Sequence, residues 1–357
     1  MNLLDKIKFI LKKPKVIIVT GEGRKTAKEA IFQVVKGHFK IGGELLIYET
    51  DLQEFKDFEF LVKKSRLPVL VVTHVGEYHP EREFFAGELE QVSKITKLAE
   101  ALPSHGYLIL NFDDETVRDI KNKSQAHPLT FGFGARADIQ ATDIVLTGVP
   151  ALGTNFKINY EGKIVPVWLE RLFGKEQIYA ALTAAGAGEA LDLNLVEISG
   201  ALKFYQGLPG RMRLIRGIKN SWVLDDSENA SSLSMLEALE VLRKIEIPCL
   251  PAGRPARKIA VLGDILGIGK YSIEAHEAIG EKVKAAADLL FTAGPRTHFI
   301  AQGAKAKGMA LEKIFQYDTV EALRIPLQNE IKENDLILID GSSEMKMAEA
   351  VEEIKAP

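Results

Sequence analysis

The chain has 357 residues, of which 46% are hydrophobic and 27% are charged, and its net charge is −3. This length accommodates two domains and the composition is that of a globular protein, while the near balance of charges gives no reason to expect nucleic acid as a partner. The single cysteine, Cys249, excludes an internal disulfide and fits a reducing cytoplasm, and no apolar run approaches the ~20 residues that span a bilayer, so no transmembrane segment is expected.

Residues 1–14 are interpreted as a short amphipathic helix that leads into the first strand. A signal peptide is not favoured, because lysines and Pro14 interrupt the apolar stretches and no small-residue cleavage site follows. A minor alternative is weak contact of this segment with a membrane surface through its lysines, Lys6, Lys8, Lys12 and Lys13.

Buried-strand patterns then alternate with helical periodicity. The strands are predicted at residues 15–20, 44–49, 67–75, 106–112 and 128–133, with a helix at 88–102. Short apolar runs separated by amphipathic helices favour a mostly parallel sheet that is covered on both faces.

A stretch of different character follows, over residues 138–170. It alternates apolar and polar residues around the turn at Tyr160-Glu161-Gly162, which is typical of hairpin strands. An Ala-rich helix is predicted at 175–191, and the Gly- and Pro-containing segment 204–215 is the predicted domain boundary.

Strand and helix patterns alternate again from residue 221 to the end of the chain. The predicted fold class is therefore α/β, with a central P-loop-type, mostly parallel sheet domain (15–208) followed by a Rossmann-like C-terminal α/β domain (209–357). In such sheets ligands bind at the carboxyl ends of the strands.

The first strand runs into a glycine-rich turn that contains Gly21, Gly23, Arg24, Lys25 and Thr26, and an amphipathic segment follows. This is the layout of a phosphate-binding loop, in which backbone N–H groups and a lysine offset the phosphate charge and a hydroxyl binds Mg²⁺. These five residues are the candidates for nucleotide binding. An ordinary strand-to-helix turn with exposed charges is the alternative.

Two further side chains follow neighbouring predicted strands. Glu49 ends the second strand and His79 lies just after the third, so a carboxylate and an imidazole could hold a metal ion near the phosphates, together with Thr26. Either residue by itself is more often simply solvated.

In the second half, Asp225, Asp226, Ser227 and Asn229 form a turn between a strand and a helix. Capping of this helix by at least one of Asp226 and Ser227 is the favoured interpretation of the turn. The glycines of 263–272 do not have the spacing of a dinucleotide-binding loop.

Several segments then match one family in chain order. The second half contains LPGRM (208–212), VLDDSENASSLSM (223–235), KIAVLGDILGIGKYSIEAHEAIG (258–280), DLLFTAG (288–294) and DLILIDGSSEMKM (335–347). The first half adds VTGEGRKTAKEA (19–30), HVGEYHPE (74–81), GYLILNFDDE (106–115) and FGFGARADIQATDI (131–144). Together they resemble the Mur ligases, and most closely the branch that adds D-alanyl-D-alanine to the peptidoglycan precursor.

The resemblance implies an ATP-dependent amide ligase that requires Mg²⁺. In this family ATP phosphorylates a carboxylate of a UDP-linked muramoyl peptide, and an amine attacks the acyl phosphate. A UDP-linked peptide or small molecule is therefore the implied substrate, other cell-wall enzymes are candidate partners, and the cytoplasm is the implied location.

The resemblance also assigns roles to particular residues. Lys25 corresponds to the phosphate-loop lysine, Thr26 to the metal-binding hydroxyl, and Glu49 and His79 to the metal-binding carboxylate and imidazole. A second set of candidates comprises Lys94, near the position that the family carbamylates, Arg211 at the Gly-Arg domain junction, and Asp226 and Asn229 in the turn that closes over the nucleotide.

The phosphate loop departs from the family pattern. Aligned through Lys28-Glu29, it is one residue short and Arg24 takes the place of the catalytic lysine. Aligned through Lys25-Thr26, Arg24 stands where the family has glycine, and its Cβ would obstruct the cradle.

Other departures lie outside the loop. Gln177 and Ala180 replace helical asparagines near the adenine, and Asp340, Glu344 and Lys346 stand where the family has a basic residue, glycine and arginine. Only residues 1–14 precede the first strand, so we expect the N-terminal UDP-binding domain to be absent and the substrate to need another anchor.

Two functional hypotheses therefore remain open. The first is an active, short Mur-type ligase. The second is a catalytically degenerate relative that acts as a binding or regulatory protein in cell-wall synthesis. A different nucleotide-using α/β enzyme that shares only the fold is disfavoured by the ordered matches.

Overall fold

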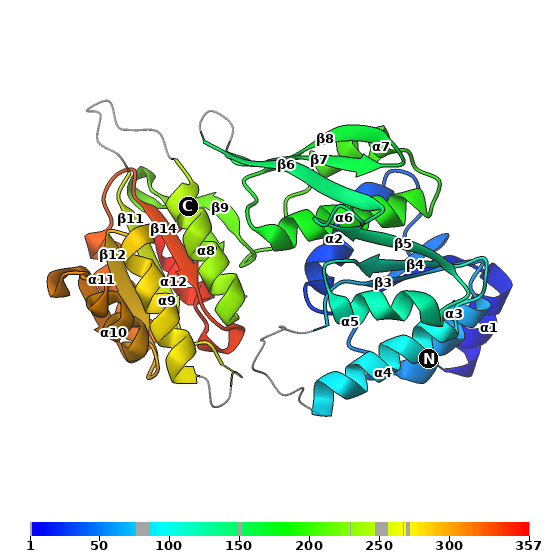
Figure 1. The fold of residues 1–357 in the computed structure, drawn as a ribbon, viewed down its shortest axis with the longest axis horizontal. Helices are drawn as coiled ribbons and strands as arrows, with labels where there is room; N and C mark the ends of the chain where they lie inside the picture. Colours follow the sequence, from blue (N-terminus) through cyan, green and yellow to red (C-terminus); the bar gives the residue numbers. More distant parts are fainter. Residues whose placement is uncertain are drawn as a thin grey trace. The chain divides into compact units, whose positions relative to one another are not determined.

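The computed structural model describes residues 2–75, 86–148, 152–228, 230–246, 256–266, 268 and 272–356. The chain divides into two compact units, each with its own sheet (Figure 1). Unit 1 comprises Met1–Val145, Asn155–Leu169 and Lys175–Tyr205, and unit 2 comprises Leu146–Thr154, Glu170–Gly174 and Gln206–Pro357. Unit 2 thus includes three short segments of the predicted 15–208 domain, namely residues 146–154, 170–174 and 206–208.

Unit 1 is built on an eight-stranded sheet with the order β2-β1-β3-β4-β5-β6-β7-β8. The strands are β1 (Lys15–Thr20), β2 (Leu45–Thr50), β3 (Leu67–Val72), β4 (Tyr107–Asn111), β5 (His127–Gly132), β6 (Ile139–Thr147), β7 (Gly153–Tyr160) and β8 (Lys163–Glu170). The pairs from β2 to β6 are parallel. As predicted, β7 and β8 form a hairpin, because they are sheet neighbours joined by Glu161 and Gly162, both at positive φ.

Helices cover both faces of this sheet. They are α1 (Leu3–Lys12), α2 (Arg24–Val35), α3 (Phe55–Lys64), α4 (Ala86–Glu100), α5 (Glu115–Arg118), α6 (Lys175–Glu189) and α7 (Leu195–Leu202). Val16 and Ile18 of β1 pack in a core with α3 and α4. On the other face α2 packs against α6. Helix α6 also lies close to the sheet, because a Cβ on its Gly186 would be 3.0 Å from Ile109 of β4.

One strand boundary differs from the prediction in a way that matters for the site. Strand β3 ends at Val72 rather than at Val75. The next two residues, Thr73 and His74, bind the loop after β1 instead of continuing the strand. The Thr73 N–H donates to the Thr20 carbonyl (3.0 Å), and the His74 carbonyl accepts the Glu22 N–H (2.7 Å).

Unit 2 has a six-stranded sheet with the order β13-β12-β11-β14-β10-β9. The strands are β9 (Arg213–Arg216), β10 (Trp222–Asp226), β11 (Lys258–Gly263), β12 (Leu289–Ala293), β13 (Ile314–Tyr317) and β14 (Leu336–Asp340). The helices are α8 (Ser232–Lys244), α9 (Ser272–Ala286), α10 (His298–Ala306), α11 (Val320–Glu330) and α12 (Ala348–Ile354). All strand pairs are parallel except β9 with β10, so the predicted α/β class is confirmed.

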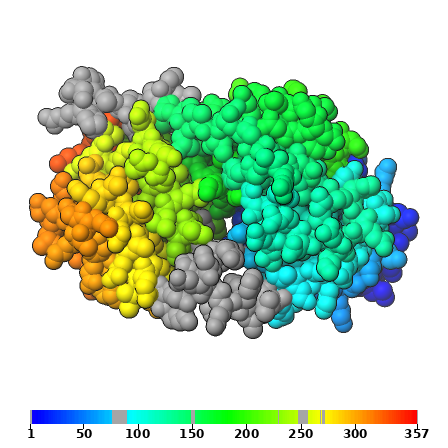
Figure 2. All heavy atoms as spheres, in the orientation of Figure 1, coloured from blue at the N-terminus to red at the C-terminus, as the bar shows by residue number. Residues whose placement is uncertain are grey.

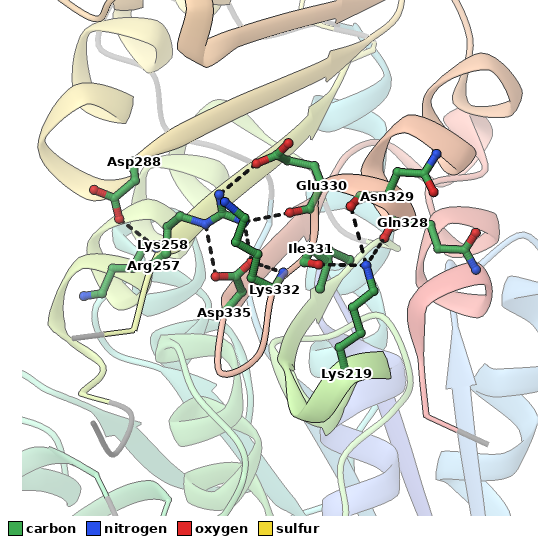
Figure 3. A network of polar contacts seen from close by, with 10 residues as sticks. All are labelled: Lys219, Arg257, Lys258, Asp288, Gln328, Asn329, Glu330, Ile331, Lys332 and Asp335. Atoms are coloured by element: carbon green, nitrogen blue, oxygen red, sulfur yellow. Dashed lines mark hydrogen bonds and ion pairs between the residues drawn. The ribbon is translucent and has the colours of Figure 1, made fainter. Parts of the chain in front are cut away.

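A polar network closes the amino-terminal end of this second sheet (Figure 3). Arg257, just before β11, binds the Asp335 carboxylate through two nitrogens (2.7 and 3.1 Å) and binds Glu330 at the end of α11 (2.8 Å). Lys219 donates to the carbonyl groups of Gln328 (2.9 Å) and Ile331 (2.8 Å). The network lies at the edge opposite to the carboxyl ends of the strands, so it holds the fold together rather than facing a ligand.

No helix within the described part of the chain is long and apolar enough to cross a membrane.

Candidate functional site

The loop after β1 has the backbone of a tight phosphate-binding turn. Gly21 has φ +101°, and a Cβ there would lie 2.5 Å from both the His74 carbonyl oxygen and the Thr73 hydroxyl. That hydroxyl is within hydrogen-bonding distance of the carbonyl groups of Thr20 (3.0 Å) and Glu22 (2.5 Å). Only glycine fits at position 21, and the loop is held firmly against the residues that follow β3.

Gly23 ends the loop and Arg24 begins helix α2. Gly23 lies in the left-handed region (φ +70°) and forms the N-cap without a side-chain hydrogen bond. The N–H groups at the start of α2 are thus left for an anion or for water, and the helix dipole favours the anion. The glycine that permits this turn is Gly23, so Arg24 occupies a helical position, not the position of the turn glycine.

Arg24 holds the carboxylate that was predicted to bind metal. Its Nε lies 3.1 Å from Oε2 of Glu49, near the end of β2, and its Nη1 donates to the Gly21 carbonyl (3.3 Å). Val19 and Glu49 are register partners on β1 and β2, which brings Glu49 beside the loop. Glu49 therefore lies beside the loop with a guanidinium as its neighbour, and its role as a metal ligand stays a prediction.

Thr26 is buried and also has a protein partner. Its hydroxyl lies 2.5 Å from Oε1 of Glu176, in the first turn of α6, and its carbonyl accepts a hydrogen bond from the Tyr205 hydroxyl (3.3 Å). Burial, helped by the neighbouring carboxylates of Glu176 and Glu29, raises the pKa of Tyr205, which keeps it a donor. Lys25, which lies between Arg24 and Thr26 in the sequence, has an exposed side chain.

Glu176 is a residue of this site that the sequence did not reveal. Besides its contact with Thr26, its side chain lies 3.6–3.7 Å from where a Cβ on Gly23 would be. A carboxylate thus lies against the start of α2, the place where a phosphate would bind. Its separation from Thr26, 150 residues along the chain, leaves no local sequence signal.

His74 and Asp114 form a second polar pair next to the loop. The His74 Nδ1 lies 2.8 Å from Oδ2 of Asp114, and the same carboxylate accepts the N–H groups of Val75 (2.9 Å) and Val117 (3.1 Å). Burial opposes the charged form, but these hydrogen bonds outweigh it and lower the pKa of Asp114. The sequence signal that could have identified His74 is its position directly after a buried strand. The predicted imidazole, His79, lies outside the described residues.

The predicted Lys94 is on α4 and forms an ion pair with Glu90 on the same helix (2.7 Å). A lysine paired with an acid one turn away is an ordinary feature of a helix surface. None of the described contacts joins Lys94 to the loop of Gly21 and Gly23, so its catalytic role stays a prediction.

The predicted residues of unit 2 surround the end of β10. Asp226 is fully buried and accepts the Met212 N–H (3.0 Å), while Asp225 accepts the N–H of Gly210 (2.8 Å) and the hydroxyl of Ser227 (2.7 Å). These two acids therefore fix the chain on both sides of Arg211, which is partly exposed. Asn229 lies outside the described residues.

Neither Asp226 nor Ser227 caps the next helix. Ser231 is the N-cap of α8, and its side chain and that of Ser234 form a capping box. The interpretation that Asp226 or Ser227 caps the helix was therefore wrong, since Asp226 accepts the Met212 N–H and the Ser227 hydroxyl donates to Asp225.

Asp340, at the end of β14, lies in the interior. It is fully buried, and burial raises its pKa well above the usual value for a carboxyl group. In its neutral form this side chain cannot attract a cation and adds no charge to the sheet edge.

Mg²⁺ is bound in proteins mainly by hard oxygen ligands. Hard oxygen ligands are present at the loop, but Thr26 binds Glu176 and Glu49 binds Arg24. No group of three or more His, Cys, Asp or Glu side chains within the described ranges is arranged to hold a metal ion. In this conformation the oxygen ligands predicted for Mg²⁺ at the loop are therefore engaged by other side chains of unit 1.

Comparisons with known proteins match most of the chain to the domains of one family. The model of the Mur ligase middle domain matches residues 7–188, and that of the Mur ligase glutamate ligase domain matches residues 210–343. The UDP-N-acetylmuramoyl-tripeptide–D-alanyl-D-alanine ligase of Bacillus subtilis (strain 168) is 24% identical over 365 residues, covering 95% of this chain and 76% of that protein.

Solved structures share the fold. MurF from Acinetobacter baumannii superposes with a TM-score of 0.77 at 19% identity, covering 97% of this chain and 78% of that one. MurF ligase from Thermotoga maritima, solved in complex with ADP, gives a TM-score of 0.75 at 19% identity and covers 98% of this chain and 81% of that one.

Proposed function

The chain belongs to the Mur ligase family, and from this premise we propose that it is an ATP-dependent ligase that joins an amine to a carboxylate of a UDP-linked muramoyl peptide. The observation that supports ATP binding is the tight turn of Gly21 and Gly23, which runs directly into the N-terminus of α2 without a side-chain cap from Gly23. The substrate class is suggested by the Bacillus subtilis relative, a UDP-N-acetylmuramoyl-tripeptide–D-alanyl-D-alanine ligase.

Three groups of unit 1 would bind the phosphates of the nucleotide. The first-turn N–H groups of α2 would donate to phosphate oxygens, and Lys25 would offset their charge from an exposed position. Arg24 already lies beside the loop and adds a second fixed cation there. ATP would supply the phosphoryl group that converts the carboxylate into an acyl phosphate, from which an attacking amine displaces phosphate to form the amide.

The test of this proposal is calorimetric titration of the protein with ATP, with and without Mg²⁺. We expect a dissociation constant in the micromolar range, weakened at least about tenfold by Lys25→Ala because a phosphate contact is lost. Lys36→Ala, at the other end of the same helix, is the matched control and should leave the affinity unchanged. Equal dissociation constants for the parent and Lys25→Ala would contradict the proposed role of the loop.

Turnover is tested separately by phosphate release. The proposal requires release that depends on both the muramoyl tripeptide substrate and D-alanyl-D-alanine, and that stops when either is omitted. Release with neither substrate present would indicate a simple ATPase instead.

A second candidate function is a non-catalytic binding or regulatory protein of cell-wall synthesis. It is favoured by the ion pair of Arg24 with Glu49 and by the contact of Thr26 with Glu176, which engage two side chains that the family uses for metal. Binding of ATP or of the peptide substrate, without any phosphate release, would favour this candidate over the ligase.

A further inference from the structure

Helix α1 presents an apolar stripe to the solvent. Five large apolar side chains of this ten-residue helix are exposed, by between 43% and 79%: Leu3, Leu4, Ile7, Ile10 and Leu11. With 3.6 residues per turn, they fall within an arc of about 120° on one side of the helix. The N-terminal residues, dark blue in Figure 2, form part of the outer surface of unit 1.

The opposite side of α1 is anchored to the domain. Phe9 is buried, and its ring packs against Phe60 of α3 at 5.8 Å between centroids. Lys6 pairs with Asp57 (3.3 Å) and lies over the same Phe60 ring. The exposed stripe is therefore not a core face that the fold failed to cover, because the helix already has a separate core face.

Basic side chains border the stripe on both sides. Lys8 and Lys12 follow one edge and Lys6 follows the other, while Lys13 is exposed at the C-terminal end. The one acid of the helix, Asp5, is four residues before Phe9 and thus on the anchored side. An apolar stripe with lysines along its edges is the pattern of a helix that lies in the interface of a membrane.

We propose that α1 docks unit 1 on the surface of an anionic lipid bilayer. The apolar side chains would enter the headgroup and acyl boundary while Lys8, Lys12 and Lys13 meet the lipid phosphates. A second copy of the chain in an antiparallel pairing fits this face less well, since the edge of Lys8 and Lys12 would meet the same edge of the other helix and like charges would repel. Because the chain as a whole has a net charge of −3, attraction to an anionic bilayer requires a local group of lysines such as that on α1.

The test is co-sedimentation of the full chain with vesicles. We expect binding to vesicles of equal parts phosphatidylcholine and phosphatidylglycerol at least about tenfold stronger than to phosphatidylcholine alone, and weaker at high salt. Replacing Leu4 and Leu11 together by serine should abolish binding, and Lys8→Gln with Lys12→Gln should reduce it. Phe9 is kept in all variants, so unchanged melting temperatures verify the fold.

The matched control replaces two apolar residues of similar exposure elsewhere, Val196 and Leu311, by serine. This control should bind like the parent. The proposal is overturned if the parent does not sediment with anionic vesicles, or if the Leu4 and Leu11 variant sediments equally. It is also overturned if light scattering shows a dimer that the same variant dissociates, because the stripe would then be an interface between copies.

Discussion

Arg24 and Glu176 surround the phosphate loop with opposite charges. Arg24 extends from the first position of α2 to Glu49, and Glu176 reaches from α6 to the hydroxyl of Thr26. The guanidinium favours a bound triphosphate, whereas the carboxylate repels it. If the loop binds ATP as proposed, we therefore expect its affinity to depend on the balance of these two side chains.

The prediction that follows concerns Glu176→Gln. Glutamine keeps an acceptor for the Thr26 hydroxyl but removes the negative charge beside the helix N-terminus, so we expect the affinity for ATP to rise about five- to tenfold. Titration calorimetry measures this. Glu59→Gln, which removes a charge from α3 on the other face of the sheet, should change nothing. Unchanged or weaker binding by Glu176→Gln would show that the carboxylate supports the nucleotide site rather than opposing it.

Asp340 gives a second prediction at the scale of one side chain. Because burial raises its pKa in the folded state, the folded protein binds a proton more tightly than the unfolded chain does. Its contribution to stability is therefore fully present below the unfolded pKa of about 3.9 and is lost as the pH rises toward the folded pKa. In Asp340→Asn the side chain does not titrate, so this loss of stability with rising pH should be absent.

Urea unfolding between pH 4 and 8 measures the difference. The parent should lose stability relative to Asp340→Asn as the pH rises, by up to about 1.4 kcal/mol per pH unit, which corresponds to one proton. The exposed Asp318→Asn serves as the control and should follow the parent. Parallel pH profiles for the parent and Asp340→Asn would mean that the buried carboxyl does not titrate differently in the two states.

The loop between β1 and α2 is the element on which the proposed function depends most. Gly21→Ala introduces both a left-handed conformation for alanine and an overlap with His74 and Thr73, so we expect a loss of roughly 3 kcal/mol. Gly42→Ala is the matched control: it has a similar φ of +80° but open space, so only the backbone strain of about 1 kcal/mol applies. Urea unfolding of both variants separates the two effects, and equal losses would contradict the close packing of the loop.

At the scale of elements, the sequence predicted most of this architecture. Alternating apolar runs and amphipathic helices were sufficient for β1 to β5, and Tyr160-Glu161-Gly162 was sufficient for the hairpin. Strand β9 was missed because it is four residues long and lies in a segment whose glycines and proline indicated a boundary. Its pairing with β10 is set by the tertiary fold, which a local pattern does not encode.

The candidate site was predictable only in part, for a related reason. The glycines and Lys25 of the loop are adjacent in sequence, so their spacing carried the signal. The contacts of Arg24 with Glu49 and of Thr26 with Glu176 join residues that are 25 and 150 positions apart. Which partner each side chain finds depends on the packing of α2 beside β2 and α6, and this is visible only in three dimensions.

The unfolding of the two units can be followed separately, because each unit contains one of the two tryptophans of the chain. Trp168 lies on β8 in unit 1 and Trp222 lies on β10 in unit 2. With Trp168→Phe the fluorescence reports unit 2, and with Trp222→Phe it reports unit 1. The separate hydrophobic cores of the two units lead us to expect that a local lesion shifts only its own reporter.

Arg257→Ala provides that lesion for unit 2. It leaves Asp335, whose side chain is 2% exposed, without its cation, so we expect unit 2 to lose roughly 2–3 kcal/mol. Arg243→Ala, which breaks an exposed pair with Glu240 on α8, should have no measurable effect. In urea, Arg257→Ala should move the midpoint that Trp222 reports and leave the Trp168 midpoint in place. Coincident shifts of both midpoints would show instead that the two units unfold as one cooperative body.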